Sequence, residues 1–297
     1  MPLHLLFPLF SSVVFVFGMM LSKKAIDGGA SPWTGTFLAN FWLCCIWLTI
    51  AAFRGQVAPM EAWPYAAVIG VMFVLGQVFT FLAFQFGDVS VATPVFGVKV
   101  LMVAGLVSVM TDMAVSPRIW LAGGLATAGI VMIQTTGQRG STRQQKNRVL
   151  LTILLASTAA FCLSLFDVLL QKWAADYNSY DFLPVMFTSA ALLSIFVLPW
   201  VDRPARIREL KLQKWIVGGT LLMALQALSM TFSLAEFADA PRINIVYSLR
   251  GLWGVLLAWA FSRALASNES DLARSVMLQR LGGAVLLTSA VIWVIRK

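Results

Sequence analysis

Two basic side chains lie near the middle of long apolar runs, where a charge is costly. Lys99 stands in VFGVKVLM and Arg250 in YSLRGLW. A base so far from either end of an apolar helix has poor reach to water, which favours an inward-facing, functional role. The alternative is a base that snorkels or pairs with a backbone carbonyl. The planar fork of Arg250 suits a carboxylate or phosphate better than a Lys does.

One acid, Asp167, lies in the apolar segment FCLSLFDVLLQK, about a turn from its end. It has two readings. It is either a counter-ion, to Lys172 or to one of the two buried bases, or a protonatable group that couples the movement of a solute to that of a proton. Glu236, Asp88 and Asp239 are interpreted instead as turn residues or helix-end partners.

Several neutral polar residues complete the candidate binding set. Trp253 lies one helical turn beyond Arg250, although a lipid-facing Trp would look the same. The amides and phenol in apolar runs could line a binding site or satisfy hydrogen bonds between helices, which is the commoner fate. They are Asn40, Gln77, Gln85, Gln226, Asn244 and Tyr247.

Other chemistry is disfavoured by the residues that are missing. The sequence has one histidine, His4, and no phosphate-binding Gly-Lys-Ser/Thr loop. No serine has a His-and-acid partner set, and all three cysteines (Cys44, Cys45, Cys162) lie in apolar runs. We therefore predict no catalytic residues, no metal site and no cofactor. The first apolar run has no central Glu, which disfavours export of lipophilic cations.

Composition identifies the environment of these side chains. Of 297 residues, 59% are apolar and 12% charged, against about 45–50% and about 25% in soluble domains. Mean hydropathy is +0.82. The net charge of +9 reflects a shortage of acids as much as an excess of bases, and the bases gather in short loops. An integral membrane protein in contact with the bilayer is predicted, and nucleic-acid binding is not.

We find ten candidate spans between charged or Gly/Pro-marked breaks. A spanning helix needs about 20 apolar residues, so ten leave no room for a soluble domain. The expected fold is an all-α bundle of ten transmembrane helices. The candidate spans are 4–22, 33–53, 64–86, 91–111, 118–136, 149–171, 182–200, 215–236, 242–262 and 276–295.

An internal repeat relates the two halves of the chain. TFLAFQFGDVSVATPVFGVKVLM, from Thr80, aligns without a gap with TFSLAEFADAPRINIVYSLRGLW, from Thr231, at an offset of 151 residues. The alignment pairs Lys99 with Arg250. We expect one five-span repeat in residues 1–138, a basic linker loop at 139–148 and a second repeat in 149–297. Because five is odd, the second repeat would be inverted in the membrane, an arrangement typical of alternating-access transporters.

These segments resemble the drug/metabolite transporter superfamily, specifically its EamA-type members. The similar passages are FGMMLSKKAIDGGASPWTGTFLANF (17–41), FLAFQFGDVSVATPVFGVKVLMVAGLVSV (81–109) and LAGGLATAGIVMI (121–133). Thr111-Asp112 stands where the family commonly has Gly-Glu. The resemblance implies a metabolite exporter or permease of the bacterial plasma (inner) membrane. It also implies a cavity lined mainly by spans 1, 3, 4, 6, 8 and 9.

The leading hypothesis is a secondary transporter of small polar metabolites, anionic or zwitterionic, such as amino acids or organic acids. Alternatives are a permease for neutral or cationic solutes and a membrane-embedded lipid enzyme or scramblase. A homodimer is left open. So is orientation: thirteen basic residues on the side of the odd-numbered loops against six on the other place the odd loops in the cytoplasm, whereas the resemblance implies the reverse.

Overall fold

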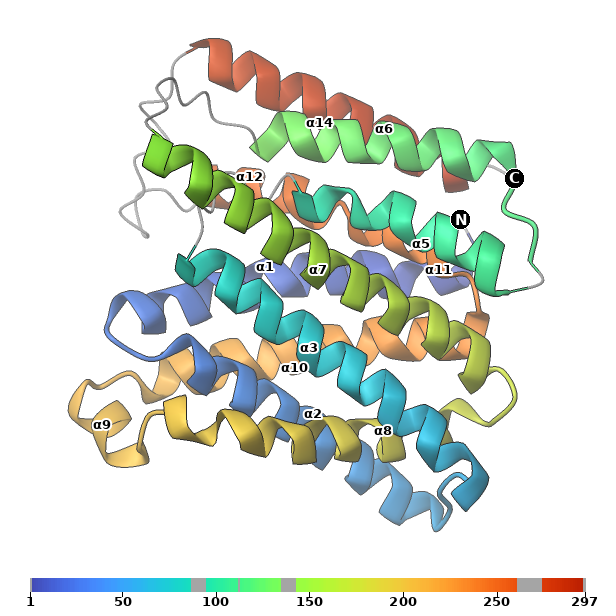
Figure 1. Ribbon diagram of the computed structural model, residues 1–297, viewed down its shortest axis with the longest axis vertical. Coiled ribbons are helices and arrows are strands. Elements are labelled where there is room, and N and C mark those ends of the chain that lie inside the picture. Colours follow the sequence, from blue (N-terminus) through green and yellow to red (C-terminus); the bar gives the residue numbers. More distant parts are fainter. Residues whose placement is uncertain (1, 87–94, 112, 135–142, 261–273, 296–297) are drawn as a thin grey trace.

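The computed structural model describes residues 2–86, 95–111, 113–134, 143–260 and 274–295. Within these ranges the chain is helical and contains no strand. The long helices lie side by side (Figure 1). The α-helices are α1 (Leu6–Asp27), α2 (Pro32–Arg54), α3 (Trp63–Phe86), α5 (Lys99–Met110), α6 (Pro117–Gln134), α7 (Arg143–Ala174), α8 (Ser179–Ser194), α9 (Pro204–Glu209), α10 (Gln213–Phe237), α11 (Ala240–Tyr247), α12 (Arg250–Ala260) and α14 (Arg274–Ile295). The 3₁₀ segments are η1 (Leu3–Leu5), η2 (Met60–Ala62) and η3 (Ile195–Trp200).

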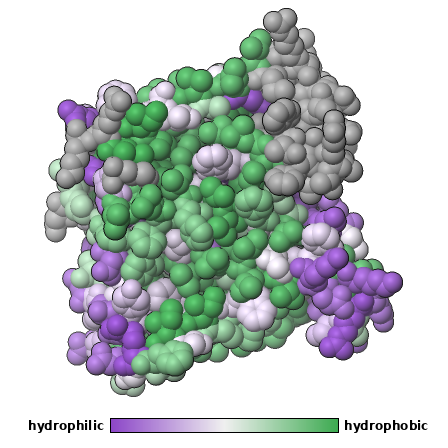
Figure 2. Space-filling view, turned by 180° about the vertical axis from the view of Figure 1, so that it is seen from behind, coloured by the Kyte–Doolittle hydropathy of each residue, from purple (hydrophilic) through white to green (hydrophobic). Residues whose placement is uncertain are grey.

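Seven helical segments among the described residues are long and apolar enough to cross a membrane. Val95–Met110 and Pro117–Ile133 are shorter apolar helices. Figure 2 shows one broad apolar face with hydrophilic residues gathered at its two sides. Large apolar side chains such as Phe53 and Phe196 are 87% and 78% exposed, which suits contact with lipid rather than water. The predicted all-α, multi-pass membrane character is confirmed.

The range 242–262, predicted as one span, is not one continuous helix. Between α11 and α12 the backbone tightens, with Leu249 N–H donating to Val246 O and Gly251 N–H to Ser248 O, both over three residues. In the first half, Val98 N–H likewise donates to Val95 O just before α5 begins. A 3₁₀ turn inside a helix often marks a functional hinge. Each of these turns immediately precedes a partly buried base, Lys99 in one case and Arg250 in the other.

The four most extensive helix contacts are symmetric when the two halves of the chain are exchanged. The most extensive contacts join α1 to α10, α6 to α14, α3 to α7 and α2 to α8. If α1 is exchanged with α7, and α3 with α10, the α1–α10 contact becomes the α7–α3 contact. Exchanging α2 with α8 and α6 with α14 leaves the other two pairs unchanged.

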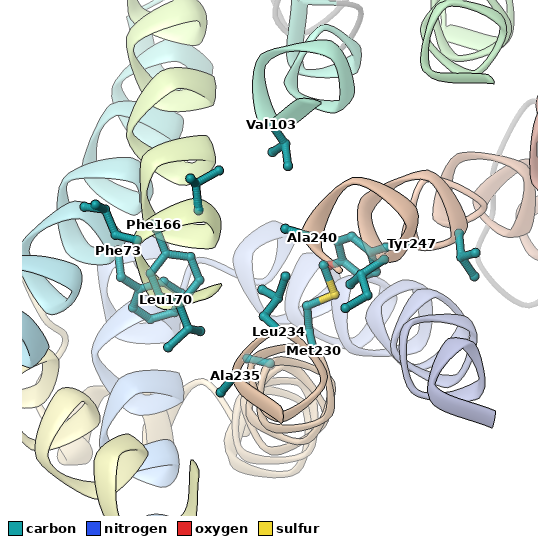
Figure 3. Close-up of a cluster of buried hydrophobic side chains, with 14 of the residues drawn as sticks. Phe73, Val103, Phe166, Leu170, Met230, Leu234, Ala235, Ala240 and Tyr247 are labelled. Atoms are coloured by element: carbon teal, nitrogen blue, oxygen red, sulfur yellow. The ribbon is translucent and has the colours of Figure 1, made fainter. Parts of the chain in front are cut away.

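The apolar core lies where α3, α7, α10 and α11 meet (Figure 3). The ring of Phe73 lies 4.9 Å from that of Phe166, centroid to centroid, with the fully buried Leu170 beside them. Leu234, also fully buried, lies nearer to Met230 and Ala240. Helices α6 and α14 pack with their backbones in close contact. A Cβ on Gly129 would lie only 2.7 Å from the carbonyl oxygen of Gly283. Small residues permit such close packing of apolar helices.

Candidate functional site

One polar face of α7 contacts the start of α5 and the start of α11. Ser164, Asp167 and Gln171 follow one another at spacings of three and four residues, which puts them on one side of the helix. The Ser164 hydroxyl lies 3.5 Å from the carbonyl oxygen of Lys99 at the start of α5. Gln171 Oε1 accepts the backbone N–H of Ala240, the first residue of α11, at 2.8 Å. One helix therefore positions the starts of α5 and α11.

Between these two contacts lies a buried ion pair. Lys99 Nζ is 2.7 Å from Asp167 Oδ2, and the two side chains are 13% and 2% exposed. The same oxygen accepts a hydrogen bond of 2.7 Å from Asn244 Nδ2 of α11. Of the two readings of Asp167, the counter-ion geometry is present, and it involves a buried base. Among the described residues no ion pair joins Asp167 to Lys172.

Arg250, unlike Lys99, is surrounded by aromatic rings. Its Cζ lies 4.9 Å from the ring centroid of Phe15 and 4.5 Å from that of Tyr247. The two rings meet edge-on, at 6.1 Å between centroids. In the part of the chain that the structure describes, no carboxylate forms an ion pair with Arg250. Cation–π contacts stabilise such a group by about 0.5–2 kcal/mol but do not neutralise its charge.

The aromatic side of the site is fixed by hydrogen bonds to α1 and α10. Tyr247 donates its hydroxyl proton to Gln226 Oε1 at 2.9 Å, and the Ser11 hydroxyl donates to the backbone oxygen of Gln226 at 3.0 Å. Trp253 Nε1 donates to the hydroxyl of Ser12 at 3.0 Å. Trp253 is partly buried, and its indole N–H is held against α1.

Charge in this cluster does not balance. Lys99 and Arg250 lie close enough for their charges to repel each other, and the one acid at hand, Asp167, is committed to Lys99. The described cluster therefore carries one uncompensated positive charge beside aromatic faces. Such a site can bind an anionic group, and the fork of Arg250 can bind it through two parallel hydrogen bonds.

Gln77 lies in a separate polar cluster. It exchanges hydrogen bonds of 2.8 and 3.1 Å with Asn40, which also donates to Ser194 Oγ at 2.8 Å. These residues of α2, α3 and the end of α8 satisfy one another, which is the interhelical alternative for Gln77. Gln85 is exposed.

The remaining acids lie at helix ends. Asp239 pairs with His4 at 3.3 Å and with Arg242 at 3.5 Å, and Glu236 is exposed. Asp88 and Asp112 lie outside the described residues. Among the residues that are described, no group of three His, Cys, Asp or Glu side chains could hold a metal ion.

Sequence reasoning missed Phe15, Ser12 and Gln171. A Phe or Ser in an apolar run has no distinguishing pattern, because such residues are equally common in cores and lipid-facing surfaces. Gln171 could have been found from its spacing of four residues from Asp167, which puts both on one helix face.

Comparisons with known proteins bear on the fold alone. No family model matches the sequence, and no curated protein matches it. The structure is similar to 29 chains of known structure. One of them, described only as the crystal structure of a protein, covers 98% of this chain and 96% of its own length, with a TM-score of 0.71 and 13% sequence identity. At that identity the likeness extends to the arrangement of helices and no further.

Proposed function

We propose that the protein is a secondary transporter of small polar metabolites that carry an anionic group, such as amino acids or organic acids, and that it works by alternating access. The observation that carries this proposal is the partly buried guanidinium of Arg250, which contacts two aromatic rings and pairs with no described carboxylate. A charge at membrane depth is costly without a partner. A transported anion would supply that partner for part of each cycle.

The proposed architecture is that of an EamA-type, ten-span bundle of two inverted repeats. Its support is the 151-residue offset, the exchange symmetry of the helix contacts, and a tight turn before both Lys99 and Arg250. Interrupted helices near the membrane midplane, one from each repeat, are a common way to build a substrate site. The site residues come from both halves, as a site exposed to alternate sides requires.

Asp167 is the proposed proton-coupling group. Its Oδ2 holds Lys99 of the first half and Asn244 of the second at once. Protonation would remove the charge that attracts Lys99 and so weaken the connection between the halves. A proton that binds and leaves in each cycle would then link the transmembrane pH gradient to the rearrangement.

Uptake into proteoliposomes tests the transport function. Purified protein would be reconstituted and offered radiolabelled amino acids, mono- and dicarboxylates, neutral sugars and organic cations, with protein-free liposomes as the control. We expect saturable uptake of a carboxylate-bearing solute. Uptake confined to neutral or cationic solutes, or movement of fluorescent lipid between leaflets without solute uptake, would overturn the proposal.

A further inference from the structure

Lys99 and Arg250 have different partners at corresponding places. Lys99 faces the carboxylate of Asp167 on α7, whereas Arg250 faces the ring of Phe15 on α1. An offset of 151 residues pairs Lys99 with Arg250 and carries Asp167 to Val16, the neighbour of Phe15. The contacts of α1 with α11 and α12 correspond, on exchange of the halves, to those of α7 with α5. Where one half supplies an acid, the other supplies an aromatic ring.

We infer that Phe15 occupies the place of a counter-ion, so that the substrate's single carboxylate completes the charge balance of Arg250. This inference rests on the proposed transport function and names the substrate class of the same site. A ring attracts a guanidinium through its π-face but accepts none of its strong in-plane hydrogen bonds. Apart from a hydrogen bond to the Tyr247 hydroxyl, the donors of Arg250 thus stay available to a carboxylate, while Phe15 and Tyr247 limit how the guanidinium can turn.

The net charge of the cluster favours a substrate with one negative charge. Lys99 and Asp167 neutralise each other, so Arg250 contributes the one excess charge of the described cluster. A monocarboxylate brings that charge to zero, whereas a zwitterionic amino acid can pair its carboxylate with Arg250 but adds its own ammonium charge. A dicarboxylate adds a second negative charge, which finds Lys99 already paired and Asp167 repelling it in a low-dielectric site. Rings of Phe15, Tyr247 and Trp253 can pack against an apolar part of the substrate.

Replacing Phe15 with a resident acid tests the inference. Phe15→Asp would give Arg250 the partner that Lys99 already has, and we expect the affinity for a radiolabelled monocarboxylate to fall at least about tenfold. Phe15→Asn introduces a side chain of nearly the same shape as aspartate but without its charge. We expect this variant to retain more affinity than Phe15→Asp. Equal affinities in the two variants would overturn the counter-ion role of this position.

Wild-type selectivity gives a second, independent readout. We expect lactate to displace the bound monocarboxylate at least about tenfold better than succinate. Equal displacement by the dicarboxylate would overturn the inference even if Phe15→Asp fails to fold. A wild-type protein that transports no carboxylate would instead overturn the proposed function, so the two failures are distinguishable.

Discussion

Lys99 and Asp167 form an ion pair of 2.7 Å between a helix of the first half of the chain and a helix of the second. Asn244, also in the second half, binds the same carboxylate oxygen. Arg250, which aligns with Lys99 at an offset of 151 residues, has aromatic rings where Lys99 has the acid. We propose that Lys99 organises the bundle and that Arg250 binds the substrate.

Lys99→Ala is expected to destabilise the protein more than Arg250→Ala. Removing Lys99 leaves the carboxylate of Asp167 buried without its counter-ion, which costs about 3–5 kcal/mol. Removing Arg250 leaves only ring faces without a partner. Thermal unfolding in detergent would measure both, and the double variant Lys99→Met/Asp167→Leu should recover part of the loss. Equal unfolding temperatures for the two alanine variants would contradict this difference in role.

Asp167→Asn is expected to abolish uptake driven by a pH gradient while equilibrium exchange of labelled substrate continues. An amide keeps the size and a hydrogen-bonding oxygen but cannot bind and release the coupling proton. Asp181→Asn is the matched control, because Asp181 pairs with Arg54 at the end of the bundle, at 3.4 Å. Gradient-driven accumulation that is unchanged in Asp167→Asn would exclude Asp167 as the coupling group.

Tyr247→Phe and Tyr247→Leu separate two roles of one side chain. Both lose the hydrogen bond to Gln226 Oε1 and leave a buried acceptor unsatisfied, at a cost of about 1–3 kcal/mol. The Phe variant keeps the ring beside Arg250, so we expect it to retain more substrate affinity than the Leu variant. Measured in the same preparation, equal affinities in the two variants would show that the ring itself does not matter.

Gly129→Ala tests the packing of α6 on α14. The added methyl group would lie 2.7 Å from the carbonyl oxygen of Gly283, so we expect a lower unfolding temperature, equivalent to about 1–3 kcal/mol of overpacking. Gly124→Ala on the same helix is the control, since a Cβ there has nothing within 4 Å. A neutral Gly129→Ala would mean that the helices separate without cost.

The sequence predicted the helical membrane fold because a run of about 20 apolar residues is typical of a membrane-spanning helix. It missed the break between Tyr247 and Arg250, since apolar character continues across the turn. Lys99, Arg250 and Asp167 stood out because buried charges are rare and costly. Phe15 did not, because its role depends on facing Arg250 from a helix over 230 residues away in sequence. Gln77 and Asn244 are both amides in apolar runs, so the sequence does not distinguish them. Only the tertiary structure shows that Asn244 contacts Asp167 and that Gln77 lies in another cluster.

The role of Arg250 is tested most directly by the affinity of Arg250 variants for a radiolabelled monocarboxylate that the wild-type protein binds. We expect Arg250→Ala to bind it at least about tenfold more weakly, roughly 1.4 kcal/mol. Arg250→Lys should recover part of that loss, because Lys lacks the two-pronged geometry. Arg54→Ala is the control, since Arg54 also lies against a ring, that of Tyr180, but pairs with Asp181 at the end of the bundle. Wild-type affinity in Arg250→Ala would contradict the central claim that this guanidinium meets the substrate.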